Sequence, residues 1–260
     1  MSPSVPVRSI VVKNADEIAL MYEANQHVAA VLKTLMSVVD VGQTTWELDK
    51  IAEDYCKKNK MRPAFKGYNG FPGCLCVSVN EEVVHGIPSR KKKLKKGDIV
   101  SVDFGVEYRG YYGDSAVTIP VGQISAEAKK LLQVTDESLH RGIAQAVAGN
   151  RISDISKAVQ QHAEAHGFGV VRQFVGHGIG SDLHEAPEIP NFYSGERSPR
   201  LLPGMVLAIE PMLNVGTANV KVLRDGWTVV TADHRFSAHF EHTVAVTEEA
   251  PRVLSSREIA

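Results

Sequence analysis

Four carboxylates lie inside segments of the sequence that are otherwise typical of apolar strands. Asp103 follows Ile-Val-Ser-Val, Asp114 stands within Tyr-Tyr-Gly-Asp-Ser-Ala-Val, Glu210 follows Val-Leu-Ala-Ile, and Glu241 precedes His-Thr-Val-Ala-Val. An ionised carboxylate in a protein core costs several kcal/mol unless it is paired. A solvent-facing side of a strand would account for any one of these acids alone, but all of them together indicate that cations must be supplied.

Two divalent cations would offset the charge of four carboxylates. Without metal, repulsion between the like charges would raise the pKa values of such a cluster strongly. Oxygen ligands with one or two imidazoles suit Mn, Fe, Co or Zn in a dinuclear site, whereas a structural zinc prefers Cys and His. The acids therefore predict a two-metal centre.

Histidines in glycine-rich segments supply the candidate imidazoles. They occur in His85-Gly-Ile-Pro88 and in Gly176-His-Gly-Ile-Gly180, which is followed by His184-Glu-Ala-Pro187. Flanking glycines let the backbone and the ring approach a ligand closely, although such a histidine is equally compatible with a structural role. The pair His162 and His166 fits an exposed helix face better, because the intervening glutamate is not where the H-E-x-x-H zinc motif needs it.

An internal repeat organises the elements that must position these side chains. The segments 94–103 and 201–210 each contain a turn glycine, an apolar run and an acid six residues after that glycine. The two glycines, Gly97 and Gly204, stand 107 residues apart, and at the same offset the segments 42–51 and 149–158 each combine a glycine with a helix start. Duplication would place Asp103 and Glu210 at equivalent positions facing a pseudo-twofold axis.

Hydrophobic spacing gives the expected secondary structure. Capping-box patterns at Asn14–Glu17 and Thr44–Glu47 predict two helix starts. The predicted helices cover about 15–39, 125–148 and 153–166, and a further helix begins at 44–47 and continues through Tyr55. The predicted strands cover 74–79, 98–106, 111–119, 205–213, 227–231 and 239–247. The second and third strands should form a hairpin through residues 107–110. We expect an α/β (α+β) fold in which a helix-helix-strands unit is duplicated around a central antiparallel sheet.

Composition bounds the remaining interpretation. The chain has 260 residues, 43% of them hydrophobic, and a net charge of −1, which is typical of a globular protein with no overall attraction to polyanions. Three cysteines are too few for a disulfide framework, and no apolar run has the length of a signal peptide or membrane span. We expect a cytoplasmic monomer with an N-terminal extension (1–12), one catalytic domain (13–250, pseudo-repeats 13–120 and 121–247) and a C-terminal tail (251–260).

The ordered polar residues resemble type I methionine aminopeptidases of the bacterial kind from about residue 12 to 250. The resemblance is carried by His85, Asp103, Asp114, His177, His184, Glu210 and Glu241, together with the segments 79–88, 176–180 and 225–227. The resemblance implies the pita-bread fold of the creatinase/aminopeptidase type and removal of N-terminal methionine from peptides and nascent chains when the second residue is small. It implies that two divalent ions (Co, Fe, Mn or Zn) are held by Asp103, Asp114, His177, Glu210 and Glu241.

The same resemblance implies further roles. Glu210 would double as general base, His184 would stabilise the oxyanion, and His85 would position the peptide and assist the leaving amine. The methionine pocket would be lined by Phe65, Tyr68, Phe71, Cys76, Leu183 and Trp227. Three residues depart from well-known bacterial members: Phe65 replaces cysteine, Asn69 replaces a frequent histidine, and Leu183 replaces phenylalanine. These departures concern the shape of the pocket and leave the chemistry intact.

Two further expectations concern ions and partners. Asn80, Glu82 and Ser237 match positions that surround a monovalent cation in some members. The segment Arg90–Lys96 carries six cations in seven residues. It is either a solvated turn or a surface that docks on ribosomal RNA near the exit tunnel.

Two rival functions are compatible with part of the pattern. An Xaa-Pro aminopeptidase or prolidase shares the fold and a similar His-Gly-Ile-Gly…His-Glu-x-Pro stretch. Those enzymes usually carry an extra N-terminal domain, for which residues 1–12 leave no room. A metal-free peptide-binding module of this fold would lack ligands, whereas all five are present here.

Overall fold

The computed structural model describes residues 9–257, so residues 1–8 of the expected N-terminal extension and 258–260 of the expected tail lie outside the described residues. The helices of the described part are α1 (Ala15–Val38), α2 (Thr45–Lys58), α3 (Ala126–Ile143) and α4 (Ile152–Ala165), with a 3₁₀ turn η1 (Tyr68–Gly70). The strands are β1 (Arg62–Pro63), β2 (Leu75–Val79), β3 (Glu82–Val84), β4 (Ile99–Tyr108), β5 (Tyr111–Pro120), β6 (Gly169–Val170), β7 (Gly176–Gly178), β8 (Glu185–Ile189), β9 (Val206–Ile209), β10 (Met212–Asn214), β11 (Val220–Val222), β12 (Val229–Thr231), β13 (Ser237–His239), β14 (His242–Ala245) and β15 (Arg252–Val253).

The first two helices begin where their capping patterns predict. The side chain of Asn14 accepts hydrogen bonds from the amides of Asp16 and Glu17, and Thr44 accepts one from the amide of Glu47. In both cases the backbone amide of the capping residue donates a hydrogen bond to the glutamate carboxylate. These bonds satisfy backbone groups that would otherwise be unpaired at the helix start. The helix predicted to reach residue 148 instead ends at Ile143. The chain turns there, and the amide of Gly149 donates to the carbonyl of Leu201 in the second half of the repeat.

The internal repeat is visible in the backbone pairing. Isolated β-bridges join Thr44 to Lys93 and Arg151 to Arg200, and each residue of the second bridge lies 107 positions after its counterpart. Hydrogen bonds at the same offset run from Gly42 to Leu94 and from Gly149 to Leu201. The predicted duplication is therefore confirmed.

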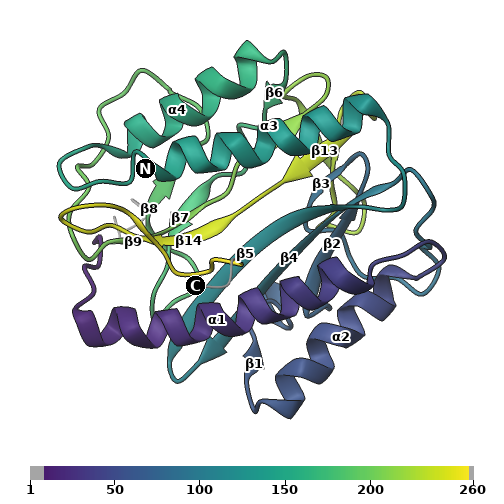
Figure 1. Ribbon diagram of the computed structural model, residues 1–260, viewed down its shortest axis with the longest axis horizontal. Helices are drawn as coiled ribbons and strands as arrows, with labels where there is room; N and C mark the ends of the chain where they lie inside the picture. Colours follow the sequence, from purple (N-terminus) through teal and green to yellow (C-terminus); the bar gives the residue numbers. More distant parts are fainter. Residues whose placement is uncertain (1–8, 258–260) are drawn as a thin grey trace, which may run out of the picture.

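Antiparallel sheets occupy the space between the helix pairs. Figure 1 shows α1 and α2 along one side of the molecule and α3 and α4 along the opposite side, with the strands between them. The sheet orders are β1-β4-β2 with β5 beside β4, then β13-β10-β6, β11-β12-β3 and β15-β14-β9-β7-β8. The predicted β4–β5 hairpin is confirmed, with Tyr108 opposite Tyr111. Its turn residues Arg109 and Gly110 both have positive φ, as a tight two-residue turn requires.

The prediction that 205–213 and 239–247 are single strands is wrong, and each is broken at an acid. Glu210 and Pro211 separate β9 from β10, while residues 240–241 separate β13 from β14. Proline has no amide hydrogen for the ladder, and the Glu241 amide donates to the carbonyl of Ala116 in the other half. As a result, both acids project from irregular backbone where the two halves meet.

The halves share one core and are joined by buried side-chain hydrogen bonds. Residues of both halves, from Val28 and Phe104 to Leu139 and Leu207, belong to the same buried apolar cluster. Ser115 Oγ donates to the Glu241 carbonyl at 2.6 Å, and Thr243 Oγ1 donates to the Asp114 carbonyl at 2.7 Å. Within residues 9–257 no helix combines the length and the apolar character needed to cross a membrane.

Candidate functional site

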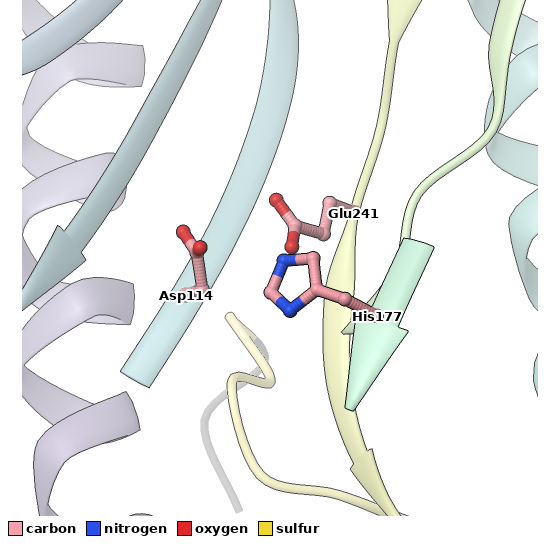
Figure 2. A group of neighbouring side chains, drawn as sticks. All are labelled: Asp114, His177 and Glu241. Carbon is pink, nitrogen blue, oxygen red and sulfur yellow. The ribbon is translucent and has the colours of Figure 1, made fainter. Parts of the chain in front are cut away.

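The two halves of the repeat each contribute two carboxylates to one side of a buried cavity. This side, formed by Asp103, Asp114, Glu210 and Glu241, is called the carboxylate wall below. Asp103 pairs with Ala116 and Asp114 pairs with Gly105, so these acids lie two residues apart on neighbouring strands and share a face. His177 lies on β7, opposite Ala208 of β9. Single ligand atoms of Asp114, His177 and Glu241 lie within 4.8 Å of one another. Figure 2 shows these side chains close together, with Asp114 from β5, His177 from β7 and Glu241 from the segment directly before β14.

Asp103 and Glu210 complete the wall, because they line the same cavity as the other three residues. One Glu210 oxygen lies 3.6 Å from His177 Nε2, and the other lies 3.5 Å from His239 Nε2. The structure therefore brings together all five residues expected to bind metal. His239 is an additional neighbour that was not among the residues expected to bind metal. His239 lies two residues before Glu241, and side chains two residues apart in an extended strand point to the same side. This spacing was the signal in the sequence for their proximity.

The donor atoms fit divalent metal ions. Asp103 Oδ1, Asp114 Oδ1 and Glu241 Oε1 are buried and have no hydrogen-bond partner among the described residues, which is rare for native polar groups. His177 Nδ1 lies 2.9 Å from the Gly178 carbonyl oxygen. A proton on Nδ1 would satisfy that carbonyl and leave the Nε2 lone pair for a metal, as is usual for histidine ligands.

Burial and repulsion between like charges shift the pKa values of the wall acids and of His177. Burial raises the pKa of Asp103 well above its ordinary value, with further contributions from Asp114 and Glu210. Burial also raises the pKa of Asp114 to about 7 and that of Glu241 well above the usual range. Burial and the neighbouring His184 lower the pKa of His177 to about 3. Without bound cations the wall resists ionisation, so cation binding and deprotonation are coupled.

An apolar pocket opens directly onto the carboxylate wall. The cavity encloses about 370 Å³, a size suited to a small ligand. Its apolar side contains all six predicted pocket residues: Phe65, Tyr68, Phe71, Cys76, Leu183 and Trp227. Asn69 also lines it, so all three departures from the family pattern face the cavity. Val84, Phe174 and Val175 line it too and were not predicted.

Two histidines lie where the pocket and the wall meet. His184 Nδ1 is 2.9 Å from the Tyr68 hydroxyl, and the His184 ring centroid is 4.3 Å from that of His177. His85 has a φ of 59° and contacts the Phe174 ring edge-on at a centroid distance of 5.5 Å. Burial, with the neighbouring His184, lowers the pKa of His85 to about 4, so its imidazole is neutral at pH 7.

The remaining predicted ion site lies outside the residues that line the cavity. The Asn80 amide donates to Asp98, the Glu82 carboxylate pairs with Lys92, and the Ser237 hydroxyl donates to the Leu213 carbonyl. The monovalent cation at these positions stays a prediction. The His162 ring lies 2.8 Å from Glu137 of α3 and beside the exposed His166, but the His162 side chain is only 8% exposed, so the exposed helix-face prediction is wrong for His162.

The raised carboxyl pKa values predict how pH affects the metal-free protein. The native Asp114 carboxyl has a pKa of about 7, and the pKa values of the other three acids are raised in the same direction, so the native wall holds protons that unfolded carboxyl groups, with pKa values near 4, have already lost. The free energy of unfolding should therefore fall between pH 7 and 8, by up to about 1.4 kcal/mol per pH unit for each extra proton held. The opposing effect of the buried histidines fades as the pH rises above about 6.5, because unfolded imidazoles then lose their protons.

Chemical denaturation of chelator-treated protein at pH 7.0, 7.5 and 8.0 measures this effect. Protein saturated with Mn²⁺ is the control, because bound cations keep the carboxylates ionised and flatten the pH dependence. A metal-free protein whose free energy of unfolding stays level or rises over this interval would contradict the shared buried wall.

Comparison with known proteins places this geometry in a family. A model of metallopeptidase family M24 matches residues 19–248. The chain is 53% identical over 246 residues to methionine aminopeptidase 1 of Bacillus subtilis, covering 95% of this chain and 99% of that protein. It is 50% identical over 246 residues to the methionine aminopeptidase of Clostridium acetobutylicum, covering 95% and 98%.

Comparison with solved structures supports the same family. The crystal structure of methionine aminopeptidase from Thermotoga maritima superposes with a TM-score of 0.93 at 45% identity, covering 95% of this chain and all of that chain. A prolidase from Pyrococcus horikoshii gives a TM-score of 0.78 at 21% identity and has 64% of its length covered, a likeness of fold alone. The prolidase alternative is therefore not favoured. The chain belongs to metallopeptidase family M24, within the group of bacterial methionine aminopeptidases.

Proposed function

We propose that this protein hydrolyses the peptide bond after an N-terminal methionine when the second residue is small. The observation that carries the proposal is the cavity in which carboxylates and imidazoles on one side face an apolar pocket on the other. An unbranched thioether side chain suits a pocket built from aromatic and aliphatic groups. The names of the close relatives point to the same substrate.

The carboxylate wall would hold two divalent ions, with Asp103, Asp114, His177, Glu210 and Glu241 as ligands. When bound, such ions lower the pKa of a water molecule, polarise the scissile carbonyl and accept the free amine of the substrate. Glu210 is the proposed general base, which takes a proton from the attacking water and passes it to the leaving amine. Two imidazoles lie close to its carboxylate: His177 Nε2 is 3.6 Å from one oxygen, and His239 Nε2 is 3.5 Å from the other.

The histidines at the rim would act on the peptide itself. In our proposal the Tyr68 hydroxyl donates to His184 Nδ1, which leaves the proton on Nε2 to donate to the oxygen of the tetrahedral intermediate. His85, neutral at pH 7, would hydrogen-bond the peptide and assist departure of the amine. We propose that the enzyme acts as a monomer in the cytoplasm.

Substrate selectivity tests the proposed activity. Protein reconstituted with Co²⁺, Mn²⁺, Fe²⁺ or Zn²⁺ should release methionine from Met-Ala-Ser and leave Ala-Pro-Ser intact, measured by chromatography of the products. Cleavage of Ala-Pro-Ser instead would indicate the prolidase alternative. Absence of turnover with every metal would indicate a binding module.

Replacement of the proposed base tests the mechanism. Glu210→Gln should reduce kcat at least about 100-fold, because proton transfer by a positioned side chain contributes roughly 10²- to 10⁴-fold. The change is isosteric, so circular dichroism should show an intact fold. Glu188→Gln, on the exposed face of β8, is the matched control and should keep full activity. Near-normal kcat in Glu210→Gln would rule out the proposed role.

A second proposal concerns where the enzyme meets its substrates. Arg90 stacks on the Trp46 ring and Lys92 pairs with Glu82, so the two side chains tie the segment Arg90–Lys96 to its surroundings. Lys91, Lys95 and Lys96 are exposed. We propose that this fixed cationic surface docks on ribosomal RNA, where nascent chains emerge.

Changing Lys91, Lys95 and Lys96 to Gln should abolish co-sedimentation with ribosomes at low salt and leave cleavage of Met-Ala-Ser unchanged. The wild-type association should weaken steeply with salt, as phosphate contacts do. A triple variant of the exposed Lys58, Lys60 and Lys129 controls for total charge. Equal loss in both triple variants, or in neither, would contradict a specific docking surface.

A further inference from the structure

The C-terminal segment packs against the strand that follows Glu241. Strand β15 pairs with β14, with Val253 opposite Val244. Leu254 is fully buried, and its carbonyl accepts a hydrogen bond from Gln26 of α1. The Ser255 hydroxyl lies 2.8 Å from His242 Nδ1 and accepts a bond from the Thr243 amide. The segment 252–257 thus ties α1 to the backbone beside a proposed metal ligand.

Arg257 extends this contact to the backbone of two ligands. Its Nη1 donates to Ser115 Oγ at 2.8 Å, and Ser115 Oγ donates to the Glu241 carbonyl at 2.6 Å. Ser115 is fully buried and directly follows Asp114. One guanidinium therefore fixes the hydroxyl that links the Asp114 strand to Glu241.

The charge of Arg257 lies behind the metal wall. Arg257 does not line the substrate cavity and instead borders a groove that also contains Asp136, His140 and Phe240. Burial lowers its pKa to about 10, with Asp136 and Glu241 acting in the opposite direction, so the guanidinium stays cationic at pH 7. The carboxylates of Asp136 and Glu241 favour its charge, and the groove also contains the imidazoles of His140 and His242.

We propose that Arg257 is a positioning residue of the metal centre, through which the C-terminal segment holds Asp114 and Glu241 in a geometry ready to bind metal. It acts through Ser115 and does not touch the substrate. The inference rests on the metal binding of the proposed function, and it is independent of which peptide is cleaved. Outer groups that orient metal ligands typically contribute 10- to 100-fold in affinity.

Metal titration of four variants tests this role. Arg257→Met removes the hydrogen bond and the charge, Arg257→Lys keeps the charge, and Ser115→Ala breaks the relay while leaving Arg257 in place. Arg252→Met is the matched control, because Arg252 lies in the same segment and stacks on the Tyr22 ring instead. Each metal-free protein is first checked for folding by circular dichroism and thermal unfolding. Co²⁺ is then titrated by calorimetry and by visible absorption, which reports the ligand geometry.

Arg257→Met and Ser115→Ala should each weaken Co²⁺ binding about 10- to 100-fold and alter the visible spectrum, and their double variant should be no weaker than the worse single variant. Arg257→Lys should recover part of the loss, and Arg252→Met should match the wild type. Wild-type affinity and spectrum in folded Ser115→Ala would overturn the inference, even if Arg257→Met failed to fold. A wild-type protein that binds Co²⁺ but releases no methionine would contradict the proposed function and leave this inference standing.

Discussion

Repulsion among four buried carboxylates is the constraint on which the rest of the structure depends. Asp103, Asp114, Glu210 and Glu241 share one wall, and their pKa values are all raised by burial. Removing a lone carboxylate from water costs several kcal/mol, and grouping several adds like-charge repulsion. Only bound cations offset both effects, so the architecture must hold these side chains firmly enough that they do not turn away from one another.

The duplicated fold meets this requirement by dividing the wall between two halves. Each half places one acid, Asp103 or Glu210, at the same point of the repeat. The strand breaks at Glu210 and Glu241 place two acids at the seam, which is the boundary between the two halves. Buried hydroxyls of Ser115 and Thr243 then bond the halves across that seam. The rigid wall leaves the opposite side of the cavity free for apolar side chains, which provide substrate selectivity.

Local signals in the sequence were sufficient for the helix starts and for the acids that line the cavity. Asn14 and Thr44 cap their helices within a few residues, and acids inside apolar runs are unusual enough to identify by inspection. The strand break at Pro211 has a local signal, because proline cannot donate to a strand ladder, whereas the break at Glu241 depends on the hydrogen bond of its amide to Ala116 in the other half. The contact of Arg257 with Ser115 spans 142 positions along the chain, and no local pattern indicates it.

The most direct test of the shared wall is anomalous diffraction from crystals grown with Mn²⁺ or Co²⁺. We expect two peaks within bonding distance of the oxygens of Asp103, Asp114, Glu210 and Glu241, with His177 Nε2 on one of them. Both metals should bridge the two halves of the repeat. Anomalous peaks confined to one half, or absent from this wall at saturating metal, would contradict the account.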